Sequence, residues 1–570
     1  MIKVAVFILS FFVISYSNAQ HQVVLQEAHR YIDQDKKLII CNQSTLVLNT
    51  LYGGEKNAIF IDEAYQFETA IEDFEIGKAY QLIQESTGTT YLLYFSELPL
   101  ISIVVQDSIV NEPDVAAYFT MIEPNGTLTQ SHMGIQYRGY SSQNYPKKSM
   151  ALSFWQDASG TEKRNITLLG LINDDDWNLQ AMYNEPIRSR SKSGYDLWRS
   201  INTLHYQHLE PLAINGVRME YVEVFINGDY RGVYCVGEKP KRKQFRLRAH
   251  NGTIRGELYK AFAPGANDFS DCPPFFNSLN TWGGFEYKYP KAETNWQNLH
   301  DFVNFVVHSD STTFYDNYHE HFEIDNAVDY FIFLNLLRLT DNITKNNFIA
   351  KYHTHSKYFY IPWDLDGSFG INWNMLPDLE TEDLLTNGFF NRLILDCSPN
   401  GFRDKLTNKW HELRTDVLTA ENIMELFYEN HDFLELNGVY EREMLAWNEY
   451  AYDSLHLQKI QDWLENRLTF LDGQFTEHCK PLGTAVFSNF SKVIVYPNPA
   501  QDILYIQHDL FDLIEKLELY DMRGQLAIRK TDNCNVLNIS GLNSGTYLLQ
   551  IYFRTRMTYE TILISVQPTK

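Results

Sequence analysis

The residues best suited to chemistry lie in one stretch, DNITKNNFIAKYHTHSKYFYIPWDLDGSFG, residues 341–370. Asp341 is followed five positions later by Asn346. Asp364 and Asp366 come near the end of the stretch. Phosphoryl transfer from a nucleotide needs such a set, because one carboxylate must receive or orient the acceptor proton while an amide and a second carboxylate hold Mg²⁺. Mg²⁺ prefers oxygen ligands, and one or two carboxylates beside the phosphates suffice for it.

The same residues also have a purely structural interpretation. Asp-Leu-Asp-Gly at 364–367 can close an ordinary turn, and Asp341 with Asn342 can cap a helix. Asn346 and Asn347 can satisfy the backbone of a loop. Because a D-x4-N spacing is common, the order of the surrounding elements has to decide between the two interpretations.

A helix followed by a β-hairpin is predicted around these residues. Apolar residues recur at helical spacing in IDNAVDYFIFLNLLRL, which predicts a buried helix over 325–339 with Asp325 as its N-cap. Two strands follow, at 346–353 and 357–364. The order helix, Asp, Asn, hairpin, Asp and Gly is also the order of the corresponding parts in protein kinases.

An upstream segment, YRGYSSQNYPKKSMALSFW, carries groups suited to phosphates. Arg138, Ser141 and Ser142 come first, and Lys147 and Lys148 then enter a predicted strand. Hydroxyl and backbone N–H groups can cradle phosphates, and a lysine on the next strand can reach them as a point charge. Adjacent strand residues point to opposite faces, so only one of the two lysines can face a site.

Two further segments add charged residues. VEVFINGDYRGVYCVGEK predicts a hairpin around its Asn-Gly turn and ends in Glu238, a carboxylate that could pair with the phosphate-binding lysine. LINDDDWNLQAMYNEPIRSR contributes Asp176, Trp177 and Arg188. No useful G-x-G-x-x-G loop accompanies these segments.

Together these blocks resemble the CotH kinase family, the spore-coat-type atypical kinases. R-G-x-S-S with P-K-K, D-x-D-W, N-G-x-x-x-G-x-Y-x-x-x-E, D-x4-N-N and W-D-x-D-x-x-x-G occur here in that order, across roughly residues 98–475. The resemblance implies an ATP-dependent kinase with a minimal kinase-like fold. It also implies Mg²⁺ or Mn²⁺ as the metal, and hydroxyl side chains of surface proteins, or of the chain itself, as acceptors.

The resemblance gives each candidate residue a role. Asp341 is the expected catalytic carboxylate and Asp364 the expected metal ligand. Asn346 and Asp366 are further expected metal ligands, and Glu238 is expected to position one lysine. The residues expected at the nucleotide phosphates are Arg138, Ser141, Ser142, Lys147 and Lys148.

The first residues predict export. MIKVAVFILSFFVISYSNAQ has one Lys, an apolar stretch and small residues before Gln20, which is the pattern of a signal peptide over 1–19. Its apolar run is well short of the ~20 residues that cross a bilayer, and we expect no membrane-spanning segment elsewhere. Residues 20–97 then alternate as short strands, which predicts a small β-rich domain. Strands and long helices mix over 98–475, so the expected fold class is α+β.

The C-terminal part has its own pattern. After a predicted linker at 476–490, the pattern of residues 491–570 predicts a seven- or eight-stranded β-sandwich. This part resembles the C-terminal sorting domain of proteins exported by the type IX secretion system of Bacteroidota. By this resemblance the chain crosses the periplasm and reaches the cell surface or the medium through the type IX machinery. A sandwich module that binds sugar or protein is the alternative. The matching residues are Tyr496, Pro497, Asn498, Pro499, Tyr520, Asp521, Gly524, Gly541, Leu542, Gly545 and Tyr547.

The net charge of the chain limits the classes of partner that it can bind. The chain has 48 Lys and Arg against 72 Asp and Glu, a net charge of -24 that is spread along the sequence. Such a surface repels phosphate backbones and anionic lipid, so we expect neither nucleic acid nor a membrane surface as partner.

The chain has six scattered cysteines and no CxxC motif. The sequence is equally compatible with free thiols and with one or two disulfide bridges. The histidine pairs at 353/355 and 319/321 lack a third zinc ligand at the usual spacing and are expected in exposed loops.

Three functions stay open on the sequence. The first is a secreted protein kinase. The second is a non-catalytic surface scaffold or adhesin with the same fold, against which the joint presence of Asp341, Asn346 and Asp364 argues. The third is a module of a polysaccharide-degrading assembly, which would be marked by a glycosidase or carbohydrate-binding domain; none is apparent in this sequence. The acceptor protein remains unidentified.

Overall fold

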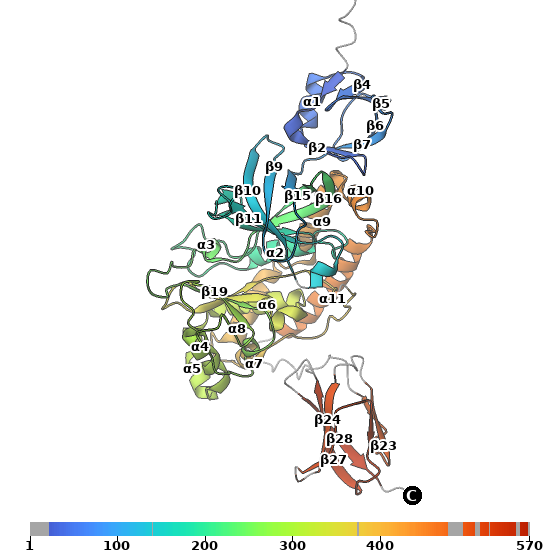
Figure 1. Cartoon of the computed structure of the whole chain (residues 1–570). Coiled ribbons are helices and arrows are strands. Elements are labelled where there is room, and N and C mark those ends of the chain that lie inside the picture. The colour runs from blue at the N-terminus through green and yellow to red at the C-terminus, as the bar shows by residue number, and fades with distance from the viewer. Residues whose placement is uncertain are drawn as a thin grey trace, which may run out of the picture. The chain divides into compact units, whose positions relative to one another are not determined.

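The computed structural model describes residues 22–139, 141–372 and 376–476, and in the C-terminal part 494–507, 514–521, 523, 525–553 and 559–567. The chain divides into two compact units, with the boundary after residue 480 (Figure 1). The expected signal peptide and nearly all of the expected linker lie outside the described residues.

The first unit begins with a seven-stranded sheet in the order β1-β4-β5-β6-β7-β3-β2, with the short helix α1 (Thr45–Leu51) beside it. Apolar residues of this sheet form their own core around Ile59, Leu82 and Leu93. The β region predicted at this end is therefore confirmed. The strands are β1 (Gln22–Val24), β2 (Arg30–Asp33), β3 (Leu38–Cys41), β4 (Lys56–Phe60), β5 (Ala64–Ile71), β6 (Ala79–Gln84) and β7 (Thr90–Phe95).

A closed barrel follows, with strand order β10-β11-β14-β16-β15-β8-β9. Its interior is filled by apolar side chains such as Phe119, Phe154 and Trp177, as expected of a barrel with few strands. Closure fixes the position of every strand end, including the end of β16, from which the chain leaves the barrel. The strands are β8 (Leu100–Val105), β9 (Val115–Ile122), β10 (Leu128–Tyr137), β11 (Met150–Trp155), β14 (Asp176–Gln180), β15 (Met219–Ile226) and β16 (Asp229–Gly237).

The rest of the first unit combines a five-stranded sheet, in the order β18-β19-β17-β20-β21, with helices (Figure 1). The mixed α+β fold predicted from the sequence is thus confirmed. The strands are β17 (Glu257–Ala261), β18 (Thr281–Trp282), β19 (Phe285–Tyr289), β20 (Asn347–Lys351) and β21 (Tyr358–Pro362). The helices are α2 (Arg190–Ile201), α3 (Arg242–Phe245), α4 (Gln297–His308), α5 (Ser311–His321), α6 (Ile324–Leu336), α7 (Gly388–Leu393), α8 (Phe402–Arg414), α9 (Ala420–Leu436), α10 (Val439–Ala446) and α11 (His456–Phe475).

The predicted helix and hairpin before the candidate site are present, with shifted helix ends. Every residue of α6 except Asp325 is buried, which fits its nearly uninterrupted apolar sequence. Glu323, not Asp325, occupies the N-cap position. The helix ends at Leu336 and not at 339, because Arg338 adopts a left-handed conformation with φ 51°. Strands β20 and β21 pair antiparallel, as expected for a hairpin.

The second unit contains two sheets, β22-β23-β26 and β25-β24-β27-β28. Residues such as Leu504, Leu549 and Ile564 fill a core of its own, so the β region predicted at this end is confirmed. The strands are β22 (Ile494–Tyr496), β23 (Ile503–Gln507), β24 (Ile514–Asp521), β25 (Leu526–Lys530), β26 (Val536–Asn538), β27 (Gly545–Phe553) and β28 (Tyr559–Val566).

Cysteine and membrane features complete the description. Cys41, Cys235 and Cys272 are free thiols, whereas Cys397 is disulfide-bonded. Across the described parts of the chain, no helix combines the length and the apolar character needed to cross a membrane.

Candidate active site

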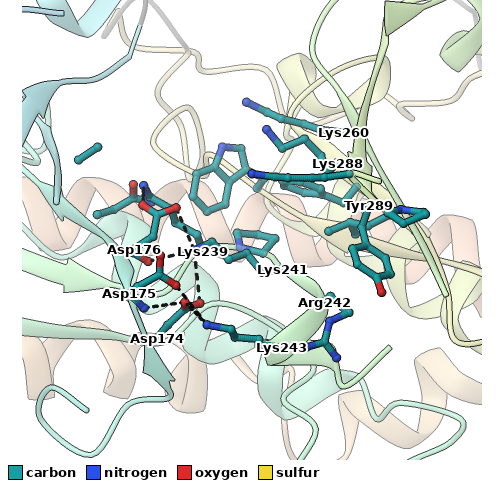
Figure 2. A pocket seen from close by; sticks show the side chains of 18 of the residues that line it. Asp174, Asp175, Asp176, Lys239, Lys241, Arg242, Lys243, Lys260, Lys288 and Tyr289 are labelled. Carbon is teal, nitrogen blue, oxygen red and sulfur yellow. Dashed lines mark hydrogen bonds and ion pairs between the residues drawn. The ribbon is translucent and has the colours of Figure 1, made fainter. Parts of the chain in front are cut away.

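A cavity of about 700 Å³ lies where the barrel meets the five-stranded sheet. The barrel contributes Arg138 and Asn178 to its wall, and the sheet contributes Lys260 and Phe348. The segment 239–243, which leads out of β16, lines a third side. Figure 2 shows Lys260 and Lys288 on one side of this cleft and three consecutive aspartates on the other.

Asp341 and Asn346 are brought together by the turn after α6. Asp341 lies in the short 3-10 helix η4 (Thr340–Ile343). Its Oδ2 accepts a hydrogen bond of 2.7 Å from Asn346 Nδ2, and its Oδ1 lies 2.8 Å from Lys345 Nζ. The D-x4-N spacing therefore produces a direct contact between the two side chains.

Asn346 is fixed from both sides by backbone hydrogen bonds. Its N–H donates to the carbonyl of Ala261 at 3.0 Å, and its carbonyl accepts from the N–H of Trp363 at 3.0 Å. Its φ of 54° is left-handed, a conformation that Asn tolerates better than most residues. The amide is thus positioned between β17 and the end of β21.

Asp364 follows β21 and is held through its backbone. Its N–H donates to the hydroxyl of Tyr195 on α2 at 2.9 Å, and its φ is 60°. Among the described residues, its carboxylate accepts no hydrogen bond and has no cation within ion-pair distance. Burial raises the pKa of Asp364, while Arg138 and Lys260 act in the opposite direction. A carboxylate so enclosed is stabilised by a bound cation.

Asp366 adds a second carboxyl group two residues later. Its Oδ2 accepts a hydrogen bond of 2.6 Å from Asn184 Nδ2. Burial, and then the neighbouring charge of Asp364, raise the pKa of Asp366 to about 7. Asp341, Asp364 and Asp366 do not converge within 4.8 Å as a three-carboxylate cluster. The three carboxylates therefore do not form a ready-made cation site by themselves.

Two cations of the cleft face Asp364. Arg138, at the end of β10, donates to Gln180 Oε1 at 3.1 Å, and its guanidinium lies 5.6 Å from the ring of Trp363. Lys260 projects from β17, and burial lowers its pKa while the charge of Asp364 partly offsets this. No sequence motif marks Lys260. It is the one residue of strand β17, ELYKA, that is not fully buried.

The two lysines of the P-K-K block have different surroundings, and neither lines the described cavity. Lys148 Nζ donates to the carbonyls of Gln143 and Tyr145, at 2.5 and 3.0 Å, so it fastens its own loop. Lys147 is fully buried and lies 2.7 Å from Glu443 Oε1 of α10. Burial lowers the pKa of Lys147 to about 7, although Glu443 opposes the shift.

The expected pairing of Glu238 with a lysine of that block is wrong. Glu238 instead accepts hydrogen bonds from Arg218 Nε at 3.0 Å and Gln244 Nε2 at 3.1 Å. The carboxylate that pairs with Lys147 is Glu443, which also lies 2.8 Å from Arg188 Nη2. No sequence motif marks Glu443 of α10, because its partner Lys147 lies almost 300 residues away.

Ser141 and Ser142 lie in the loop between β10 and β11, in the 3-10 helix η2 (Ser141–Asn144). Gly139 has a φ of 99°, and a Cβ there would lie 1.9 Å from Ser142 Oγ, so only glycine permits this turn. Of the residues expected at the phosphates, Arg138 alone is among those that line the described cavity. The other assignments stay predictions.

An ion network ties the barrel to the segment 239–243. Lys241 Nζ lies 2.9 Å from Asp176 Oδ2, and Lys239 pairs with the same carboxylate. Lys243 Nζ lies 2.9 Å from Asp174 Oδ1 and 3.1 Å from Asp175 Oδ1 (Figure 2). The D-x-D-W block therefore fixes one wall of the cleft.

The histidine pairs form no metal cluster with other His, Cys, Asp or Glu groups among the described residues. His353 and His355 lie in the turn between β20 and β21, as expected. His319 and His321 do not lie in a loop. They belong to α5, where His321 stacks on Phe305 with ring centroids 4.1 Å apart.

Comparison with known families agrees with this geometry. Residues 135–471 match the family model described as CotH kinase protein, and residues 494–565 match the one described as secretion system C-terminal sorting domain. No curated protein matches the chain. The first match covers more than half of the chain and includes barrel strands β11, β14, β15 and β16, the residues that line the cleft and the Asp341 to Asp366 region. The chain therefore belongs to the CotH kinase family and carries a type IX C-terminal sorting domain.

Proposed function

We propose that this protein is a secreted atypical protein kinase. It transfers the γ-phosphoryl group of ATP, with Mg²⁺ or Mn²⁺, to hydroxyl side chains of surface proteins or of itself. The C-terminal sorting domain supports delivery to the cell surface or beyond. The acceptors are therefore sought among exported proteins.

The observation that carries the proposal is the meeting of Asp341, Asn346 and Asp364 beside a basic cleft. Asn346 contacts Asp341 directly, and the charge of Asp341 contributes to the raised pKa of Asp364. Arg138 and Lys260 provide positive charge next to these groups. A nucleotide triphosphate needs both a cationic cleft and carboxylates able to hold its metal.

The chemistry of the residues follows from their positions. Asp341, held by Lys345 and Asn346, accepts or orients the proton of the attacking hydroxyl. Asp364 and Asp366 would hold the divalent ion, with Asn346 as a further oxygen donor. The ion, when bound, neutralises charge on the phosphate oxygens. Arg138 and Lys260 stabilise the charge that develops on the transferred group, and the buried surroundings strengthen this effect.

Transfer of label from ATP to casein by the full chain, with Mg²⁺ or Mn²⁺, tests the proposal. We expect Asp364→Asn to reduce transfer by about 100-fold or more, because it removes a metal ligand while keeping the size of the side chain. Asp301→Asn is the control, since Asp301 is 63% exposed on α4. Absence of both transfer and ATP binding in the wild type would overturn the kinase and favour the scaffold.

A further inference from the structure

A second pocket, of about 480 Å³, is also lined by the segment that leaves β16. This basic segment, residues 239–255, reads KPKRKQFRLRAHNGTIR. It contains seven Lys or Arg residues and no Asp or Glu, in a chain whose net charge is -24. A local excess of this sign favours an anionic partner wherever it is not neutralised internally.

Internal neutralisation accounts for only part of the basic segment. Its three lysines pair with the aspartates of the D-x-D-W block, as described above. Arg242 and Arg246 have no carboxylate within ion-pair distance among the described residues. Arg242 only donates to the carbonyl of Leu247, at 3.4 Å, and lies 5.8 Å from the ring of Tyr289. Arg246 is exposed at the C-cap of α3.

The second pocket combines this free positive charge with exposed apolar surface. Arg242, Lys243, Arg246 and Arg248 all line it. Glu210 is the one carboxylate among its lining residues, and it lies 3.5 Å from Arg248 Nη1. Leu212, also in the lining, is 70% exposed. The pocket therefore presents guanidinium groups beside an uncovered leucine.

We propose that this pocket docks a short acidic segment of a polypeptide. Its Asp or Glu side chains pair with Arg242 and Arg246, and an apolar side chain covers Leu212. Guanidinium groups bind carboxylates through two parallel hydrogen bonds, which suits free arginines. A long polyanion such as nucleic acid, or an anionic membrane, would also extend over the acidic remainder of the chain and be repelled there.

The position of the pocket suggests what the docked polypeptide is for. Arg242 and Lys243 line both the second pocket and the cleft. A segment held in the pocket is thus tethered next to the cleft, which raises the effective concentration of any acceptor hydroxyl on the same polypeptide. This role as an acceptor-docking site depends on the proposed kinase function, whereas the binding itself does not.

Fluorescence anisotropy of the full chain with a labelled peptide tests the docking. The peptide is a short run of Asp and Glu with a central Leu, and its comparator has Asn and Gln at the acidic positions. We expect Arg242→Ala/Arg246→Ala to weaken binding about tenfold, and added salt to weaken it further. The matched control is Lys78→Ala/Lys459→Ala, which also removes two positive charges, at side chains that are 53% and 62% exposed.

Each outcome decides the proposal. The proposal is supported if the control variant binds the acidic peptide as the wild type does and the double-arginine variant binds it more weakly. The melting temperature of both variants should be unchanged. Arg246→Glu provides a second variant, at an exposed position. The proposal is overturned if the Asn and Gln peptide binds as tightly as the acidic peptide. It is also overturned if inorganic phosphate, added at the same total charge, displaces the labelled peptide as well as unlabelled acidic peptide does. Asp364→Asn should bind the acidic peptide normally. Peptide binding without phosphate transfer would therefore refute the kinase alone, and transfer to casein without peptide binding would refute the docking alone.

Discussion

At the scale of single residues, the carboxylates of Glu443 and Asp364 differ in how their charges are compensated. Glu443 has both a lysine and an arginine partner, so its charge is compensated inside the fold. Asp364 is half-buried and has no cation within ion-pair distance among the described residues, although Arg138 and Lys260 act on it from farther away. A carboxylate withdrawn from water without a direct partner is costly, and a bound cation would reduce that cost. Asp364 therefore matters more to the functional assignment than the better-connected Glu443.

Asp329 on α6 is a buried carboxyl group away from the cleft, and it predicts a pH effect. It is 6% exposed and accepts a 2.9 Å hydrogen bond from Asn202 Nδ2. Burial raises the pKa of Asp329 from 3.8 to about 7. A carboxyl group with a raised folded-state pKa contributes stability that is complete below its unfolded pKa and is lost as the pH rises through the folded pKa.

We therefore expect Asp329→Asn to be more stable than the wild type at pH 8, by roughly 1–2 kcal/mol. The difference should shrink toward pH 4, where the wild-type side chain is also neutral. Chemical denaturation at a series of pH values measures it. Equal stability differences at pH 4 and pH 8 would show that Asp329 does not titrate in this range.

At the scale of elements, α10 links the N-terminal sheet to the barrel. Glu223 of β15 accepts hydrogen bonds from Ser96 Oγ at 2.9 Å and from Tyr230 hydroxyl at 2.6 Å. Arg442 of α10 pairs with the same carboxylate and also donates to the carbonyl of Asn437 at 2.6 Å. One turn of α10 therefore carries both this contact and Glu443, the partner of Lys147.

Arg442→Met is expected to destabilise the first unit by about 3–5 kcal/mol, because it leaves the Glu223 carboxylate buried without its cation. Glu223→Gln/Arg442→Met should recover part of that loss, since both charges are then absent. Urea denaturation of the three proteins measures both effects. A double variant as unstable as the single one would mean that the guanidinium acts through packing and not through its charge.

Elements close in sequence could be predicted, whereas pairings across the chain could not. The hairpin of β20 and β21 and the helix before it follow from local periodicity, and the D-x4-N contact follows from a single turn. The partner of Lys147 is on a helix almost 300 residues later, so Glu238, nearer in sequence and part of a family block, was the wrong expectation. Lys260 could not be predicted because one lysine in a short strand does not reveal which face of the strand lines a cleft.

At the scale of the whole molecule, the cleft and the sorting domain lie in different units. The first contains the cleft, and the second has its own apolar core and its own sheets. The family matches follow the same division, with residues 135–471 in the first unit and 494–565 in the second. Since each unit buries its own apolar residues, neither needs the other for its core.

Deletion of residues 481–570 tests this division. We expect the shortened chain to melt within about 2 °C of the main transition of the full chain, because the core around the cleft keeps all of its apolar contacts. ATP binding should also be unchanged, since every residue that lines the cleft lies before residue 364. In cells that possess the secretion system, the shortened chain should instead fail to reach the surface. Scanning calorimetry, nucleotide titration and surface labelling measure the three properties. A large fall in melting temperature would show that the second unit supports the fold of the first, so that its role extends beyond sorting.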